Sequence, residues 1–178
     1  RMWACQHSGV KPDIMTSAKG LGSGMPIGAI IAKKQIMEHW KRGAHGNTFG
    51  GNPLSCAAAI ATLDLVQSEY AANAARVGEH FMGRLREMQR DYPCIGEVRG
   101  RGLMIGMELV ENDAERTPAR ALCDRLVTRG YHNGLLLLAC GVSTLRFMPP
   151  LSTTIAEVDE AIGLLRNSLD EALQGKGA

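Results

Sequence analysis

Long hydrophobic runs and an excess of charge of one sign are both missing from this chain of 178 residues. The longest strongly apolar run, residues 135–140, is far shorter than the roughly 20 residues that a membrane-spanning helix needs. The chain has 20 lysines and arginines and 18 aspartates and glutamates, which gives a net charge of +2. With so small a net charge, we do not expect the protein to bind a nucleic acid or a membrane through its overall charge. Because 45% of the residues are hydrophobic, we predict a globular protein rather than a disordered one.

Paired cysteines and paired histidines are missing as well. The five cysteines are odd in number and form no C-x-x-C motif, which argues against a disulfide framework and a zinc ribbon. No two of the five histidines are four residues apart, the spacing that aligns two metal ligands on one helical face. We therefore expect no metal site, and we expect reduced thiols in a cytoplasmic protein.

Glycine, in contrast, is abundant: there are 21 glycines, and eight of them lie between Gly20 and Gly51. The dinucleotide motif G-x-G-x-x-G fails here, because Met25 stands where its third glycine would be. A P-loop fails too, because the lysine precedes the glycines instead of following them. Nicotinamide and nucleoside triphosphate cofactors are thereby disfavoured.

Hydrophobic periodicity predicts an α/β protein. Pro53 suits the first position of a helix that Asn52 caps. The run 27–32 has the continuous apolar character of a parallel strand buried on both faces. The predicted helices cover residues 34–41, 53–69, 72–91, 117–130 and 154–173, and the predicted strands cover residues 12–16, 27–32, 95–99, 103–110, 135–138 and 145–148.

Two of these helices carry an apolar stripe, and the pattern as a whole changes near residue 70. We expect residues 1–70 to form part of an α/β layer and residues 71–178 to form an α+β unit that begins with a connecting helix. The stripes consist of Ala74, Val77, Phe81, Leu85 and Met88 in the first helix, and of Ile155, Val158, Ile162, Leu165 and Leu169 in the last.

Lys19 is the residue with the clearest chemical potential. It follows a predicted strand and is flanked by the small residues Ala18 and Gly20, which allow a ligand to approach the backbone. A solvated loop lysine is the ordinary interpretation. The functional interpretation is a Schiff-base lysine, whose neutral amine requires a partly dry site or a nearby cation. We expect the apolar strand beside it to supply that dryness.

The segment around Lys19, residues 13–29, resembles the lysine segment of the class III pyridoxal-phosphate aminotransferases. The resemblance continues through residues 46–53, 98–103 and 145–151, and it covers essentially the whole chain. It implies part of a fold-type I large domain with a mostly parallel sheet over residues 1–70. It also implies a connector helix and an α+β small domain over residues 71–178.

The resemblance also implies roles for three residues. Lys19 would form the Schiff base with pyridoxal 5'-phosphate and then move the substrate proton. Thr48 would bind the cofactor phosphate of the partner subunit in a homodimer; the alternative is an ordinary loop threonine. Arg146, which alternates with Leu145 and Phe147 on a predicted strand, would bind the substrate α-carboxylate; the alternative is a surface salt bridge.

The family's chains are much longer, and their upstream part would hold the acidic partner of the pyridine nitrogen, the stacking aromatic residue and the subunit's own phosphate loop. We therefore expect a C-terminal piece of such an enzyme, inactive when isolated. The start Arg1-Met2-Trp3, which has no initiator methionine at position 1, favours this hypothesis. The second hypothesis is a stand-alone, non-catalytic domain for assembly or binding.

The run 135–151 most resembles the 4-aminobutyrate aminotransferase branch. This implies transamination of 4-aminobutyrate, or of a related omega-amino acid, with a 2-oxo acid such as 2-oxoglutarate by a ping-pong mechanism. Acetylornithine-type aminotransferases and amino-acid racemases of the same fold are the alternatives.

Overall fold

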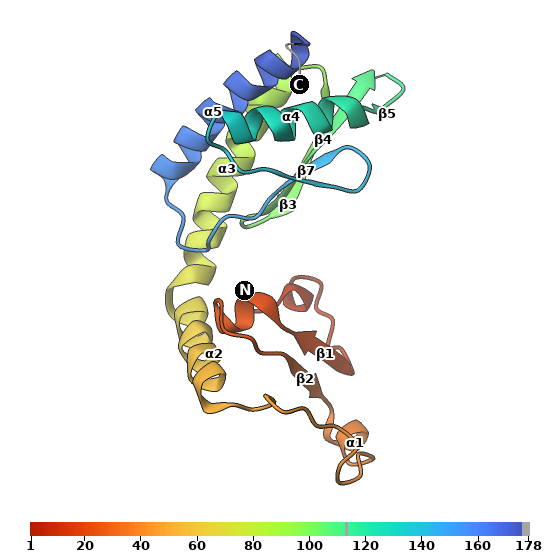
Figure 1. The fold of residues 1–178 in the computed structure, drawn as a ribbon, viewed down its shortest axis with the longest axis vertical. Helices are drawn as coiled ribbons and strands as arrows, with labels where there is room; N and C mark the ends of the chain where they lie inside the picture. The colour runs from red at the N-terminus through yellow and green to blue at the C-terminus, as the bar shows by residue number, and fades with distance from the viewer. Residues whose placement is uncertain (113, 176–178) are drawn as a thin grey trace. The chain divides into compact units, whose positions relative to one another are not determined.

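The computed structural model describes residues 1–112 and 114–175, and the chain divides into two compact units, Arg1–Ala72 and Asn73–Ala178 (Figure 1). No helix within these described residues is long and apolar enough to cross a membrane. The first unit contains η1 (Ala4–His7), β1 (Ile14–Ser17), η2 (Lys19–Gly22), β2 (Ala29–Ala32), α1 (Lys34–Met37) and α2 (Pro53–Leu65).

The sheet of the first unit corrects one expectation from the sequence. Strands β1 and β2 pair antiparallel, with Ser17 opposite Ala29, so the predicted parallel strand over residues 27–32 is wrong in its pairing. The physical reason is the short connection, because residues 18–28 fold into a tight turn and supply no crossover helix. Ile30 and Ile31 are 44% and 46% exposed, so neither face of β2 is buried within this chain.

Helix α2 begins as the sequence predicts, with Pro53 in its first turn. The Asn52 side chain accepts a hydrogen bond of 2.9 Å from the backbone N–H of Ser55, which confirms the predicted cap. The predicted break between two helices is wrong: a π-helical turn, η3 (Val66–Tyr70), leads directly into α3 (Ala71–Asp91). No glycine or proline lies between Leu65 and Ala71, so no residue there ends the helical backbone.

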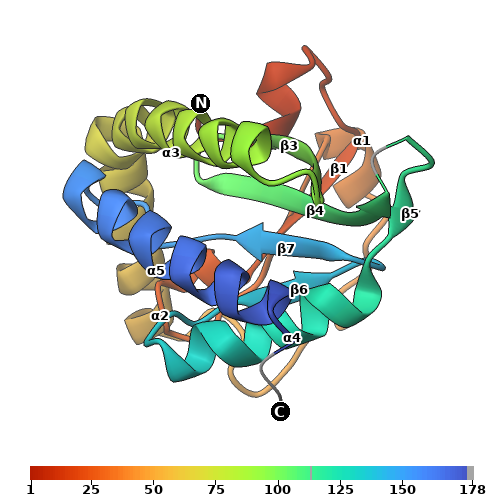
Figure 2. The same cartoon turned by 90° about the horizontal axis from the view of Figure 1, so that it is seen from above.

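The second unit is an antiparallel sheet whose strand order is β3-β4-β7-β6, and β5 pairs with the far part of β4. Helices α3, α4 and α5 pack on the same face of this sheet (Figure 2). The elements are β3 (Ile95–Arg101), β4 (Met104–Asn112), β5 (Thr117–Pro118), α4 (Arg120–His132), β6 (Leu138–Cys140), β7 (Thr144–Phe147) and α5 (Ile155–Leu173).

The predicted helix over residues 34–41 is too long, because α1 ends at Met37. Three other local predictions differ from this structure as well. Residues 117–118 form the short strand β5 rather than a helix start. The predicted strand over 135–138 is displaced, because only Leu138 of that run belongs to β6. Gly130 does not end α4: it is buried in the last turn, where a Cβ would lie 2.8 Å from Leu137 Cδ1. Close approach of the following loop explains a glycine at this position.

The core lies between the three helices and the inner face of the sheet. Every residue of the two predicted stripes packs in it or against it, which confirms both amphipathic helices. Full burial of a side chain such as Leu85 or Leu169 stabilises the unit by roughly 1.5 to 3 kcal/mol. In the first unit, Ala59 is the one buried hydrophobic residue among those described, so hydrophobic stabilisation is concentrated in the second unit.

Gly78 of α3 touches the backbone of the turn between β3 and β4. A Cβ at Gly78 would lie 2.1 Å from the carbonyl oxygen of Gly102, which itself has a left-handed φ of +53°. Backbone atoms of a tight turn have little room to retreat, so only glycine fits at this crossing.

We predict that Gly78→Ala lowers the free energy of unfolding by about 3 kcal/mol, because the added methyl group overpacks the contact between helix and turn. Gly83→Ala on the same helix is the matched control, since a Cβ there meets nothing within 4 Å. The control should raise stability by roughly 0.5 to 1 kcal/mol through helix propensity. Urea unfolding of the two variants measures both effects, and equal stabilities would contradict the prediction.

Candidate functional site

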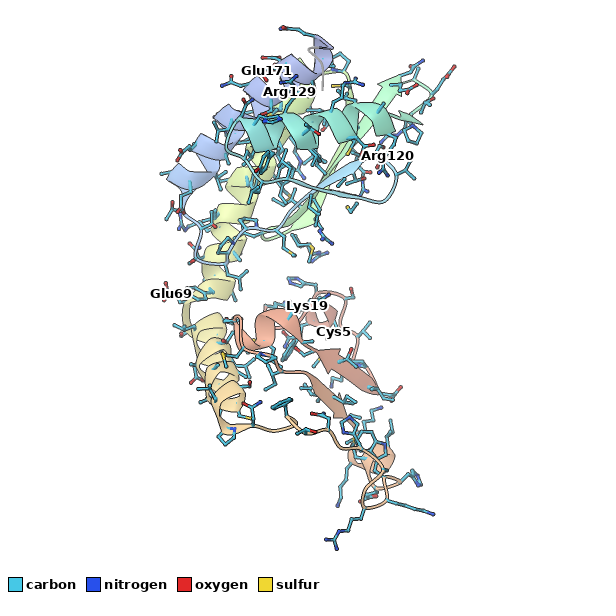
Figure 3. The ribbon with its side chains drawn as sticks, viewed as in Figure 1. Cys5, Lys19, Glu69, Arg120, Arg129 and Glu171 are labelled. Atoms are coloured by element: carbon cyan, nitrogen blue, oxygen red, sulfur yellow. The ribbon has the colours of Figure 1, made fainter. Side chains whose placement is uncertain are left out.

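Lys19 occupies a strained backbone position directly after β1 (Figure 3). Its φ is +52°, in the left-handed region, while Ala18 before it is extended with φ −157°. A non-glycine residue in this region costs on the order of 1 to 2 kcal/mol. Such strain is typical of functional positions, where the surrounding structure maintains an unfavourable conformation.

The turn after Lys19 is held by its own backbone and by one buried glycine. The N–H of Leu21 donates to the Ala18 carbonyl at 3.1 Å, and the N–H of Met25 donates to the Gly22 carbonyl at 3.0 Å. Gly22 is buried, and a Cβ there would lie 2.8 Å from Ile27 Cγ2. This packing fixes the path of η2 and therefore the position of Lys19.

The surroundings of Lys19 correct a second expectation. Lys19 is exposed, as are its neighbours Ala18 and Gly20. The adjacent strand therefore does not dry the amine, because within the first unit β1 has only β2 beside it among the described residues. A dry environment for Lys19 has to come from atoms outside the first unit.

Thr48 lies in an exposed double turn ahead of α2. The N–H of Gly50 donates to the Asn47 carbonyl at 3.2 Å, and that of Asn52 donates to the Phe49 carbonyl at 3.3 Å. The Asn52 side chain accepts from the N–H of Ser55, so this amide at the start of α2 is not free for an anion. Thr48 itself is exposed in the turn ahead of the helix.

The segments before Lys19 and Thr48 meet at one open cavity of about 480 Å³. Thr16, Ser17 and Ala18 line it from one side, and Asn47 lines it from the other. Lys19 and Thr48 do not themselves line this cavity. The sequence did not identify His45 as a wall residue; its ring stacks on Trp40 with centroids 5.3 Å apart and planes at 9°.

Arg146 lies in the second unit, on the sheet face opposite the core. Its strand neighbours Leu145 and Phe147 belong to the core, which confirms the predicted alternation. Arg146 is also among the residues that line an open, mostly apolar cavity of about 260 Å³, together with the core residues Phe81 and Phe147. The planar fork of an arginine is suited to binding a carboxylate.

The guanidinium of Arg146 lacks the ion pair that the alternative interpretation requires. Its Nε is buried and has no hydrogen-bond partner. No ion pair within residues 1–112 and 114–175 includes Arg146. An unsatisfied buried donor is costly, so this Nε stands out among the polar atoms of the second unit. Lys19 and Thr48 lie in the first unit, and Arg146 lies in the second.

Comparisons with known proteins agree with these features. The sequence profile of the family "Aminotransferase class-III" matches residues 1–169. An acetylornithine aminotransferase of Caldanaerobacter subterraneus subsp. tengcongensis is 41% identical over 172 residues, which cover 96% of this chain and 41% of that protein. The 5-aminovalerate aminotransferase DavT of Pseudomonas aeruginosa is 36% identical, with 95% and 40% covered.

A solved structure has the same fold. It is an amine transaminase from an uncultivated Pseudomonas species in a PLP-bound form, with a TM-score of 0.84 and 32% identity, and the match covers 94% of this chain and 40% of that chain. The chain spans about two fifths of the length of the curated relatives that it matches. Its neighbours are transaminases of fold type I, which confirms the predicted fold class.

We predict that Lys19→Gly stabilises the turn by about 1 kcal/mol relative to Lys19→Ala, because glycine adopts a positive φ without strain. Hydrogen exchange of the Leu21 N–H, which bonds within the turn, measures the free energy of local opening. Lys33, with φ −61°, is the matched control, and there alanine should be the more stable variant. The same order at both positions would contradict strain at Lys19.

Proposed function

Because the chain belongs to the class III aminotransferases, we propose that it provides the cofactor lysine, Lys19, and the carboxylate-binding arginine, Arg146, of a pyridoxal-phosphate-dependent aminotransferase. The observation that carries this proposal is the left-handed φ of +52° at Lys19, directly after β1. Ser23 and Arg116 also have a left-handed φ, so this conformation supports the proposal through its place in the segment that the family profile matches. A non-catalytic assembly or binding domain does not explain it.

Pyridoxal phosphate is the cofactor of this family, and the residues present fit it. The Lys19 amine is exposed at the end of a strand, where a cofactor aldehyde has access to it. The hydroxyl of Thr48 and the turn amides around it are donors suited to a phosphate. Bound pyridoxal phosphate supplies an electron sink for the substrate carbon that loses its proton.

The part proposed for Lys19 is proton movement at Nζ. As a free amine, Nζ takes the proton from the substrate carbon that bears the amino group, and it later returns a proton. The amine acts as a base only when it is neutral, which favours a desolvated position. Since the first unit by itself leaves Lys19 exposed, the proposal requires protein surface from outside this unit over Lys19 in the active enzyme.

The part proposed for Arg146 is to bind and orient a substrate carboxylate. Its planar fork provides two parallel N–H donors, and its Nε has no hydrogen-bond partner within the described part of the chain. Lysine would supply the charge without the fork. Because β7 is paired on both sides, by β4 and β6, the guanidinium projects from a rigid strand.

The exposed apolar residues of the first unit support the proposal of a homodimer. Phe49 lies in the turn beside Thr48, and Leu54 and Ile60 lie on α2; all three are exposed. Large apolar side chains that are exposed in one copy are of the kind that a second copy would cover. A second copy that covered these residues would bring Thr48 close to the second copy. This agrees with the implied role of Thr48, which is to bind the cofactor phosphate of the partner subunit.

The names of the relatives narrow the proposed amino donor. N-acetylornithine and 5-aminovalerate both carry a terminal amine on a five-carbon chain that ends in a carboxylate, whereas 4-aminobutyrate is one carbon shorter. We therefore propose an omega-amino carboxylate of five carbons as donor and a 2-oxo acid such as 2-oxoglutarate as acceptor. The 4-aminobutyrate branch stays a prediction from the run 135–151.

We predict that Lys19→Ala abolishes covalent attachment of pyridoxal phosphate and abolishes turnover in the complete enzyme. Borohydride reduction followed by peptide mass analysis locates the attachment without relying on activity. Lys33→Ala is the matched control, because Lys33 is also exposed and follows β2 rather than β1. Attachment to the Lys19→Ala variant at the wild-type level would contradict the assignment.

We also predict that the five-carbon donors have a kcat/KM about tenfold or more above that of 4-aminobutyrate, since one methylene in an apolar site is worth that factor. The measurement uses 5-aminovalerate, N-acetylornithine and 4-aminobutyrate in turn, with 2-oxoglutarate as acceptor. A preference for 4-aminobutyrate would instead support the shorter substrate. Interconversion of amino-acid enantiomers without any 2-oxo acid would support a racemase.

A further inference from the structure

A second arginine, Arg99, shares the outer sheet face with Arg146. The central strand β4 pairs with β3 on one side and with β7 on the other. Its residue Gly106 lies opposite Arg99 on β3 and opposite Arg146 on β7. The two arginines therefore flank one glycine in register, and no side chain of β4 separates them.

Glu108, two residues further along β4, lies on the same face and is one register step away from both arginines. Diagonal neighbours in adjacent strands are within reach of long side chains. In the structure Glu108 pairs with Arg99, whose Nη1 donates to Glu108 Oε2 at 2.7 Å. Arg146, the other diagonal neighbour, is left with an unpartnered Nε.

Glu97 explains why Glu108 pairs with Arg99. Glu97 lies directly opposite Glu108, and two like charges in that position repel each other. Arg99 Nη1 also donates to Glu97 Oε2 at 2.8 Å, so one guanidinium neutralises both carboxylates. Its Nη2 reaches Thr144 Oγ1 at 3.5 Å, which adds a weak tie to β7.

The charge environment agrees with this pairing. Hydrogen bonding to Glu108, reinforced by the charge of Glu97, raises the pKa of Arg99, although partial burial opposes the shift. Glu108 is the least exposed of the three charged groups, with 28% of its side chain accessible against 47% for Arg99. A carboxylate in this position needs a cation, and Arg99 and Arg146 are the two within diagonal reach.

We propose that Arg99 is a positioning residue that holds Glu108 away from Arg146 and so keeps the Arg146 guanidinium available for the substrate carboxylate. The proposal rests on the proposed function of Arg146. Without Arg99, repulsion from Glu97 would turn Glu108 toward Arg146, and an internal carboxylate would then compete with the substrate.

The first test needs neither cofactor nor substrate. Side-chain ¹H–¹⁵N spectra of the full chain, assigned with the help of Arg146→Lys, report the Nε–H of Arg146. In Arg99→Gln we expect this signal to shift and its exchange with water to slow by about fivefold, the size of one partly exposed ion pair. Arg99→Gln/Glu108→Gln should restore the wild-type signal, and Glu108→Gln alone should leave it in place.

A wild-type Arg146 signal in Arg99→Gln would overturn the proposal. A shift that persists in the double variant would overturn it as well, because the shift would then not arise from Glu108. Neither result depends on whether Arg146 binds a substrate.

The second test measures the KM for 2-oxoglutarate in the complete enzyme. Arg99→Gln should raise KM about fivefold with kcat little changed, and adding Glu108→Gln should reverse most of that rise. If Arg99 acted only through overall charge, Glu108→Gln would lower KM by the same factor in the wild-type enzyme and in the Arg99→Gln variant. That result would overturn the proposal. An unchanged KM in Arg146→Lys would instead overturn the proposed function of Arg146.

Discussion

The packing of three helices on one face of the β3-β4-β7-β6 sheet is the interaction on which the rest of the chain depends. The apolar stripes of α3 and α5 fill this core, and their burial outweighs the entropy of ordering the second unit. The first unit has no comparable core among its described residues, since Ala59 is its one buried hydrophobic side chain. Its turns are held instead by local hydrogen bonds and by the close packing at Gly22.

Patterns that depend on neighbours along the chain were predicted well. Asn52 and Pro53 marked the start of α2, and the period of apolar residues marked the buried faces of α3 and α5, because helix signals act over three or four residues. Strand pairing depends on residues far apart in sequence. The apolar pattern of residues 27–32 therefore predicts a buried parallel strand, whereas in the structure these residues pair antiparallel and their isoleucines are exposed.

For the candidate site, too, features local in sequence could be predicted and features that depend on distant residues could not. The resemblance to a known family singles out Lys19 as a candidate, and the alternation along a strand places Arg146 opposite Leu145 and Phe147. The left-handed backbone at Lys19 and the unpartnered Nε of Arg146 could not be predicted, because each depends on three-dimensional surroundings. Arg99 was missed for the same reason, since its relation to Arg146 exists only through the register of three strands.

The two proposed roles place different demands on the structure, and the two units meet them differently. A carboxylate clamp needs a fixed direction, and Arg146 obtains it from a strand that is paired on both sides and backed by the core. A lysine that moves protons needs a dry and adaptable position, and Lys19 lies on a strained turn in the unit with little core of its own. In the proposed homodimer, a second copy would cover the exposed residues Phe49, Leu54 and Ile60 and would supply part of the burial that this unit lacks. Assembly and formation of the lysine site would then be one process, whereas the strand that carries Arg146 is supported by its own unit.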